Sequence, residues 1–231
     1  MDTSQFRPLS ASMKMADLVN LDFTLVGVLS RMGIPFGFGD ATVEEVCRRQ
    51  GVHTGSFLLI CSVYAFDGYR PAKEALDKAD LHDIVRYLHL SHDYYIHVAL
   101  KELSLALDSL MEPCGVRERK VLDTFFEGYK EELLKHFAYE EETVFPHVEA
   151  VLGGNPDGFT IGEYEDNHSN IQEKIDDLKN LVMKYLPPQC DQQQIFRALF
   201  YVFTLERDLQ RHTALEDDVL VTLVNRLESH E

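Results

Sequence analysis

Apolar residues recur every three or four positions over long stretches of this chain, which is the pattern of amphipathic α-helices. The inward positions of four such stretches read Val85, Leu88, His92, Ile96, Ala99, Leu103; Leu122, Phe125, Tyr129, Leu133, His136, Glu140, Val144; His168, Ile171, Ile175, Leu178, Val182; and Ile195, Leu199, Val202, Leu209, His212, Glu216, Val219, Leu223. Short connections near residues 113–115, 153–158 and 187–188 favour antiparallel neighbours. The pattern predicts an all-α protein built on an up-down-up-down four-helix bundle.

The charge of the chain changes near residue 70. Residues 1–70 hold 6 Lys and Arg against 7 Asp and Glu, whereas residues 71–231 hold 16 against 32. Together with a turn-forming segment at residues 67–71, this shift places a domain boundary there. We predict a small N-terminal helical domain, residues 1–70, and a four-helix bundle, residues 71–231. Within the first domain, Thr42 and Glu45 have the spacing of a capping box that opens a helix.

The composition limits the partners and the compartment. A net charge of −17 repels nucleic acid and anionic membrane surfaces, so neither is an expected partner. A helix-turn-helix over residues 41–60 is disfavoured by the nearly neutral charge of its domain. The four cysteines show no paired spacing, which indicates reduced thiols. Since the chain also lacks a signal peptide and a long apolar run, we expect a cytoplasmic protein.

Six polar side chains lie at inward positions of the four helical stretches: His92, His136, Glu140, His168, His212 and Glu216. Residues four apart project from one face of a helix, so each His-x-x-x-Glu pair directs an imidazole and a carboxylate to one point. Two buried carboxylates need partners, because an unpaired buried charge is costly. A metal site would satisfy all six groups, although each histidine alone is better explained as a hydrogen-bonded core residue.

The heights of these residues agree with a single site. In the antiparallel topology, residues roughly 8–12 positions after the starts of the first and third helices meet residues roughly 11–17 positions before the ends of the other two. His89 lies one turn before His92 and is the alternative ligand, but it sits at the edge of the apolar stripe. Asp208 is a candidate partner for the second ring nitrogen of His212, with a solvated carboxylate as the alternative. His147, which follows a proline, is expected at the mouth of the site or on the surface.

The segment HFAYEEETVFPHV, residues 136–148, resembles the hemerythrin-like proteins. It is most similar to the iron–sulfur cluster repair di-iron proteins, whose second helix carries H-x-x-x-E-E-x-x-x-F-P. SHDYY at 91–95, YEDNHSNI at 164–171 and QRHTALEDDVL at 210–220 look like the ligand segments of the other three helices. The N-terminal domain resembles, more loosely, the small helical domain that precedes their bundle. It lacks the adjacent cysteines usual there, so a thiol-dependent step does not carry over.

The resemblance implies a hemerythrin-like bundle in which the six residues hold two iron ions, bridged by both glutamates and by an oxo or hydroxo group. Counting ligands then leaves one open position on each iron, since iron with N and O ligands suits six. Oxygen-carrying hemerythrins have a further histidine where this chain has Gln172. This difference favours reactivity with nitric oxide, O2 or peroxide over oxygen carriage.

We therefore expect a non-haem di-iron protein that protects or repairs iron–sulfur clusters under nitrosative or oxidative stress. The alternative is a hemerythrin-like protein that binds or senses O2 or NO and signals to a partner. Small diatomic ligands or peroxide are the expected partners, with iron–sulfur proteins and a second copy of the chain, as a homodimer, as further candidates. The sequence does not decide whether the chain is an enzyme, and no residue is assigned a catalytic role.

Overall fold

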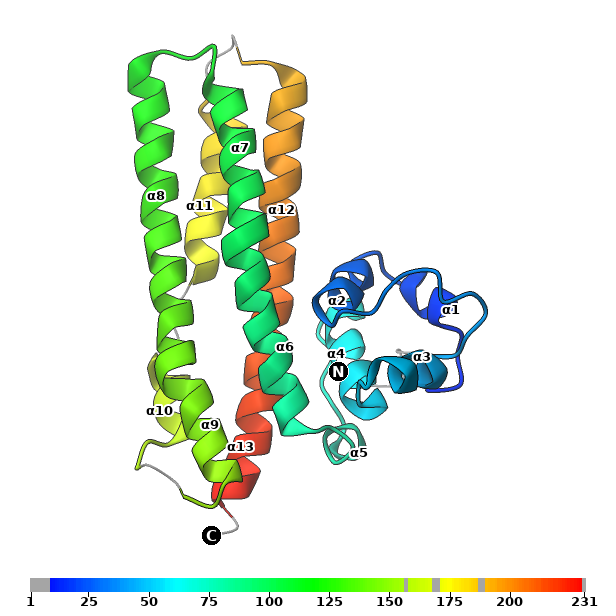
Figure 1. Cartoon of the computed structure of the whole chain (residues 1–231). Helices are drawn as coiled ribbons and strands as arrows, with labels where there is room; N and C mark the ends of the chain where they lie inside the picture. The colour runs from blue at the N-terminus through cyan, green and yellow to red at the C-terminus, as the bar shows by residue number, and fades with distance from the viewer. Residues whose placement is uncertain (1–8, 156–157, 168–170, 187–189, 230–231) are drawn as a thin grey trace. The chain divides into compact units, whose positions relative to one another are not determined.

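The computed structural model describes the chain apart from residues 1–8, 156–157, 168–170, 187–189 and 230–231 (Figure 1). The described residues form helices joined by short connections, and their one β-type pairing is an isolated antiparallel bridge between Lys14 and Thr42. The all-α prediction is therefore confirmed. No helix in the described part of the chain is both long and apolar enough to cross a membrane.

The chain divides into two compact units. One unit comprises Met1–Ser91, His147–Glu165 and Arg211–Glu231, and the other comprises His92–Pro146 and Asp166–Gln210. The boundary that the charge pattern places near residue 70 stays a prediction.

The second unit contains the four-helix bundle (Figure 1). Its long helices are α7 (Leu100–Met111), α8 (Val116–Tyr139), α11 (Ile171–Lys184) and α12 (Gln192–Leu215), and the π-helical turn η2 (Tyr95–Ala99) leads into α7. Successive helices run in opposite directions, as the short connections predict. Most of the described inward positions are buried here, among them Leu103, Leu122, Tyr129, Leu178 and Val202, and the others, such as Phe125 and Leu199, are partly buried against the same core. This agreement confirms the helical register of the described bundle.

The first unit contains the N-terminal helices α1 (Met15–Val19), α2 (Leu25–Arg31), α3 (Val43–Gln50), α4 (Thr54–Ala65) and α5 (Lys73–Leu76), followed by most of α6 (Leu81–Tyr94). It also contains most of α9 (Phe145–Leu152), α10 (Ile161–Asn167), the π-helical turn η4 (Glu216–Leu220) and α13 (Val221–Glu228). Helix α4 packs against α2, α3 and α5. Most of its side chains are buried, including Phe57, Ile60 and Tyr64. Helix α4 is therefore a core helix, unlike the exposed second helix that a helix-turn-helix requires.

The predicted capping box opens helix α3. The backbone N–H of Glu45 donates to Thr42 Oγ1 at 3.3 Å, and the backbone N–H of Thr42 donates to Glu45 Oε2 at 2.9 Å. The two side chains thus satisfy two backbone donors that a helix start leaves unpaired. At the other end, Gly51 adopts φ +67°, a left-handed conformation that ends the helix and favours glycine.

Three long helices contain one π-helical turn each, near the predicted site residues. Glu140 is the first residue of η3 (Glu140–Val144), and Glu216 is the first residue of η4. Turn η2 begins three residues after His92. A π turn holds one more residue than an α turn, and such turns occur often at functional sites. The chain therefore widens its helices where the candidate site lies.

Candidate metal centre

Four of the six predicted site residues come together as a buried group. One ring nitrogen each of His92 and His212 and one carboxylate oxygen each of Glu140 and Glu216 lie within 4.8 Å of one another. His92 is 2% exposed and His212 1%, and both glutamates are fully buried. The alternative ligand, His89, is exposed. Burial therefore favours His92 as the first-helix member of the group.

The two remaining predicted residues differ in what the structure shows. His136 lies beside the group, with its Nε2 3.2 Å from Oε1 of Glu140, one helical turn later. Its side chain is 7% exposed, more than the other described members of the site. His168 lies outside the described residues. Five of the six predicted residues are thus linked by short contacts within the described chain.

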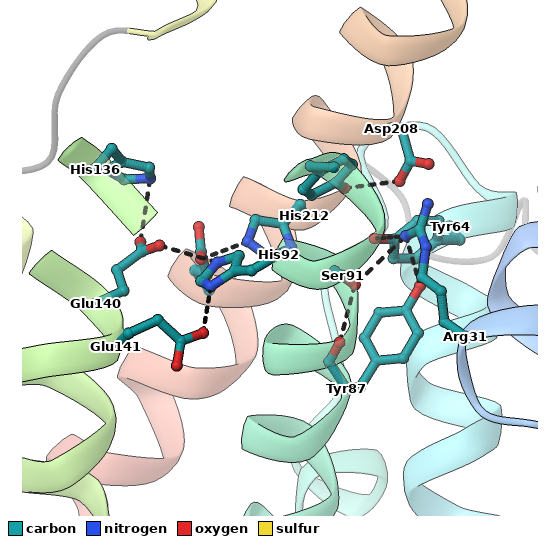
Figure 2. A network of polar contacts seen from close by, with 12 residues as sticks. Arg31, Tyr64, Tyr87, Ser91, His92, His136, Glu140, Glu141, Asp208 and His212 are labelled. Carbon is teal, nitrogen blue, oxygen red and sulfur yellow. Dashed lines mark hydrogen bonds and ion pairs between the residues drawn. The ribbon is translucent and has the colours of Figure 1, made fainter. Parts of the chain in front are cut away.

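Glu140 presents its two oxygens to two different imidazoles (Figure 2). Oε1 lies 3.2 Å from His136 Nε2, and Oε2 lies 3.2 Å from His92 Nε2. The other helix repeats the local pair, because Glu216 Oε1 lies 2.9 Å from His212 Nε2. In each contact the Nε2 nitrogen faces a carboxylate, so the Nε2 nitrogens are the ones available to a cation placed among these groups.

Glu141 contacts the other ring nitrogen of His92, and the sequence reasoning missed it. Its Oε1 lies 2.7 Å from His92 Nδ1, so that Nδ1 donates a hydrogen bond to a carboxylate (Figure 2). A carboxylate behind a histidine fixes the ring orientation and makes the opposite nitrogen a better ligand. The signal was in the sequence, since Glu141 is the second glutamate of the H-x-x-x-E-E segment.

Aromatic rings enclose His92. Its imidazole stacks on Phe137 with ring centroids 4.2 Å apart and on Phe145 with centroids 5.6 Å apart. The ring of Tyr95 also stacks on Phe137, with ring centroids 5.6 Å apart. Because both phenylalanines are buried, they exclude water from this side of the histidine and restrict its rotation.

Asp208 and His147, two polar residues near the site, each make a hydrogen bond within the described chain. Asp208 accepts a hydrogen bond from the hydroxyl of Tyr95, the first residue of η2, at 2.9 Å, and its contact with the second ring nitrogen of His212 stays a prediction. The expectation that His147 lies at a mouth or on the surface is wrong. His147 is fully buried, and its Nε2 lies 2.7 Å from Glu228 Oε1, because helix α9 continues through Pro146 with His147 on its inner face.

The core next to the site carries an uncharged phenol. Tyr129 lies two turns before His136 on α8 and is 1% exposed. Burial, and secondarily the charge of Glu206, raise the pKa of the Tyr129 hydroxyl above its ordinary range. The tyrosine therefore stays protonated at every physiological pH and adds no negative charge to an already acidic region.

The donor set fits a transition-metal cation. Two fully buried carboxylates concentrate negative charge in a low-dielectric interior, which is costly without a compensating cation. Imidazole nitrogens with carboxylate oxygens suit iron and similar divalent metals better than the all-oxygen ions calcium and magnesium. The burial of the group and the carboxylate behind His92 are also features of protein metal sites.

Two comparisons relate the chain to known proteins. The profile of the hemerythrin HHE cation-binding domain matches residues 83–224, which include all six predicted site residues. The chain is also similar to the iron-sulfur cluster repair protein ScdA of Staphylococcus haemolyticus (strain JCSC1435). The two are 23% identical over 200 residues, which cover 84% of this chain and 89% of the relative.

Proposed function

The chain belongs to the hemerythrin HHE cation-binding family, and from this premise we propose that it holds two iron ions and protects or repairs iron–sulfur clusters under nitrosative or oxidative stress. The His/Glu group supports the metal, and the similarity to a relative named as an iron–sulfur cluster repair protein supports the role. The proposed ligands are the six residues His92, His136, Glu140, His168, His212 and Glu216.

The observation that carries the proposal is the placement of Glu140. Each of its oxygens faces a different imidazole, at 3.2 Å in both cases. A carboxylate shared by two ions binds one ion through each oxygen, and each oxygen of Glu140 lies beside an imidazole nitrogen that could bind the same ion. Glu140 is therefore suited to bridge two ions, one on the His92 side and one on the His136 side.

When bound, a pair of iron ions would supply one-electron redox steps and open coordination positions for NO, O2 or peroxide. The residues of the chain prepare the site for them. Glu141 holds the proton of His92 on Nδ1, so Nε2, the nitrogen that faces Glu140, is the one that would bind a metal. Phe137 and Phe145 keep water from the His92 side. His136 is the most exposed described member of the site.

Metal analysis tests the cofactor directly. We expect about two iron atoms per chain after expression in iron-replete medium, and a near-ultraviolet charge-transfer band in the oxidised protein, because the convergent N and O donors suit an iron pair. Zinc as the sole bound metal would contradict the proposal.

Single substitutions test the bridging assignment. Glu140→Ala and Glu216→Ala should each lose more iron than His168→Ala, because a bridging carboxylate serves both ions and a terminal imidazole serves one. Glu142→Ala, an exposed neighbour of Glu140, is the matched control and should keep its iron. Retention of two irons by either bridging variant, with an empty site in His168→Ala, would show that the glutamates do not bridge.

A repair assay tests the role. A [4Fe–4S] enzyme inactivated by nitric oxide should regain activity when incubated with the iron-loaded chain, and should regain much less with Glu216→Ala. The Glu142→Ala variant should act like the unaltered chain. Equal recovery with all three proteins would separate the repair role from the metal centre and overturn the proposed function.

One observation favours the alternative function, binding or sensing of O2 or NO with a signal to a partner. Arg31, at the end of α2, is buried and donates hydrogen bonds to the hydroxyls of Tyr64 and Tyr87, each at 3.2 Å (Figure 2). It also lies 3.4 Å from the hydroxyl of Ser91, the residue before His92. The N-terminal helices thus contact helix α6 immediately beside a proposed ligand.

Hydrogen exchange distinguishes the two functions. If the chain is a sensor, NO should change the amide exchange of residues 25–65 in the iron-loaded protein, and Arg31→Met should abolish that change. Arg48→Met, an exposed arginine on α3, is the control. Unchanged exchange in residues 25–65 on addition of NO would exclude this route of signalling.

A further inference from the structure

Two cysteines that are 76 residues apart in the sequence meet in the bundle unit. The Sγ atoms of Cys114 and Cys190 lie 2.9 Å apart. Cys190 is 4% exposed, and Cys114 is partly exposed at the edge of the same apolar core. A disulfide bond is about 2.05 Å long, so a small movement of two side chains would join the sulfurs.

Local backbone structure fixes both thiols. Cys114 lies in the short connection between α7 and α8, where its N–H donates to the carbonyl of Met111 at 3.0 Å. Cys190 precedes Asp191, whose Oδ1 accepts hydrogen bonds from the N–H groups of Gln193 and Gln194 at the start of α12. The α7–α8 connection and the start of α12 lie at the same end of the bundle (Figure 1). The backbone beside each cysteine is therefore hydrogen-bonded at a helix end, which keeps the two sulfurs near each other.

We propose that Cys114 and Cys190 form a reversible intramolecular disulfide, with small-molecule disulfides such as oxidised glutathione as the oxidant. The Cys114 thiolate attacks one sulfur of the small disulfide, which breaks its S–S bond and releases one thiolate. Cys190 then gives up its proton and attacks Cys114 Sγ, which forms the protein disulfide and expels the second small thiolate. The chain loses two electrons and two protons, and the small disulfide becomes two thiols.

The order of attack follows from the surroundings of the two sulfurs. Burial, together with the adjacent Cys114 sulfur, raises the pKa of the Cys190 thiol to about 11, so Cys190 is a poor first nucleophile near pH 7. Cys114 is the partly exposed cysteine of the pair. A cavity of about 250 Å³ opens at this end of the unit, lined by residues that include Met111, Arg117, Glu118 and Leu186. Since the N–H of Cys114 donates to the carbonyl of Met111, the cavity gives a small disulfide space next to Cys114.

The disulfide site is separate from the proposed metal centre. Cys114 lies 22 residues before His136 along one helical run, which corresponds to about 33 Å at 1.5 Å per residue. The pair therefore reacts with small thiol oxidants on its own, whether or not metal is bound. In a reducing compartment a disulfide of this kind is transient and reports a shift in the thiol balance.

Thiol counting with the full-length chain tests the proposal. After anaerobic incubation with oxidised glutathione and acid quenching, alkylation in denaturant should find two of the four thiols lost. Mass spectrometry should find tryptic peptides 102–117 and 185–197 linked to each other. Cys190→Ser should instead retain glutathione on Cys114, because the resolving sulfur is gone. The Tm of the unaltered chain should rise on oxidation and should return to its original value on reduction.

Controls separate this site from general oxidation. Cys47→Ser should still form the linked peptides, because Cys47 is not part of the pair. In the unaltered chain Cys47 should stay reduced, since it is buried and its burial raises the pKa of its thiol to about 11. Cys114→Ser, at the partly exposed position, should form no intramolecular link and show no thermal shift. Four intact thiols in the unaltered chain, a link only between separate chains, or earlier oxidation of Cys47 or Cys61 would overturn the proposal.

Discussion

At the scale of single residues, the proton on His92 Nδ1 is controlled by Glu141. The 2.7 Å contact makes Nδ1 a donor, so the proposed ligand atom Nε2 has its lone pair available. Glu141 is 35% exposed on its side chain, and it therefore keeps its charge without the cost that a fully buried carboxylate carries. An acidic residue outside the group can thus strengthen a ligand without adding charge to the interior.

Glu141→Ala should weaken metal affinity about 10- to 100-fold, because His92 loses the acceptor that orients its ring. Competition against a chelator of known affinity measures the change, with cobalt(II) as a redox-stable probe. Glu142→Ala removes the same charge from an exposed position and should change affinity by less than twofold. Equal losses in the two variants would mean that Glu141 acts only through overall charge.

The periodicity of the sequence predicted several of these residues, and its limits are physical. His92, His212, Glu140 and Glu216 were recognised because they replace apolar residues at inward positions, and burial agrees. Contacts across the fold were missed, since periodicity describes one helix at a time. Cys114 and Cys190 each precede a histidine of a His-x-x-x-Glu pair by 22 residues. If the two histidines lie at the same height in the bundle, this equal spacing predicts that the two cysteines also lie at one height.

At the scale of elements, a π turn lets one helix place a polar side chain in the site and still bury its apolar face on both sides of the turn. The face before η3 packs Leu133 and Phe137, and the residues after it pack Phe145 and Val148. An extra residue in the turn lets Glu140 point into the site while both flanking stretches keep their buried faces. No propensity or spacing signals a π turn, and the sequence therefore predicted continuous helices through all three positions.

Deleting Glu142 from η3 tests this account. The deletion should convert the π turn to an α turn at a cost of about 1–2 kcal/mol, or about 2–8 °C in Tm, while iron content falls well below two per chain. Deleting exposed Glu131 from regular α8 should do far more damage, because it rotates the two halves of the helix by about 100°. Similar Tm losses from the two deletions would show that the extra residue is not stored in the turn.

The capping box is an element-scale feature that the sequence predicted fully, because all of its atoms come from four consecutive residues. Thr42→Ala should lower the free energy of unfolding by about 1 kcal/mol, since a backbone donor of α3 loses its acceptor. Thr124→Ala, on an exposed position of α8, should raise it by a few tenths of a kcal/mol through better helix propensity. Urea unfolding measures both, and the same sign for both variants would contradict the capping role.

At the scale of the whole molecule, the acidic net charge and the His/Glu group both favour the binding of a cation. A net charge of −17 raises the local concentration of cations and disfavours the compact state through self-repulsion. Within the chain, two fully buried carboxylates add a local cost that a bound cation would remove. Metal binding should therefore stabilise the folded chain.

Iron(II) added anaerobically at about 100 times its dissociation constant should stabilise the chain by about 2.7 kcal/mol, which corresponds to a rise of about 5–10 °C in Tm. The rise follows from mass action, because the donor groups converge only in the folded state. Scanning calorimetry with and without metal measures it. Glu216→Ala should show almost no rise and, since one buried charge is gone, its metal-free form should unfold no earlier than the metal-free unaltered chain. A metal-free Glu216→Ala protein that unfolds well below the unaltered one would mean that Glu216 is stabilised by the chain itself, and that metal is not what compensates its burial.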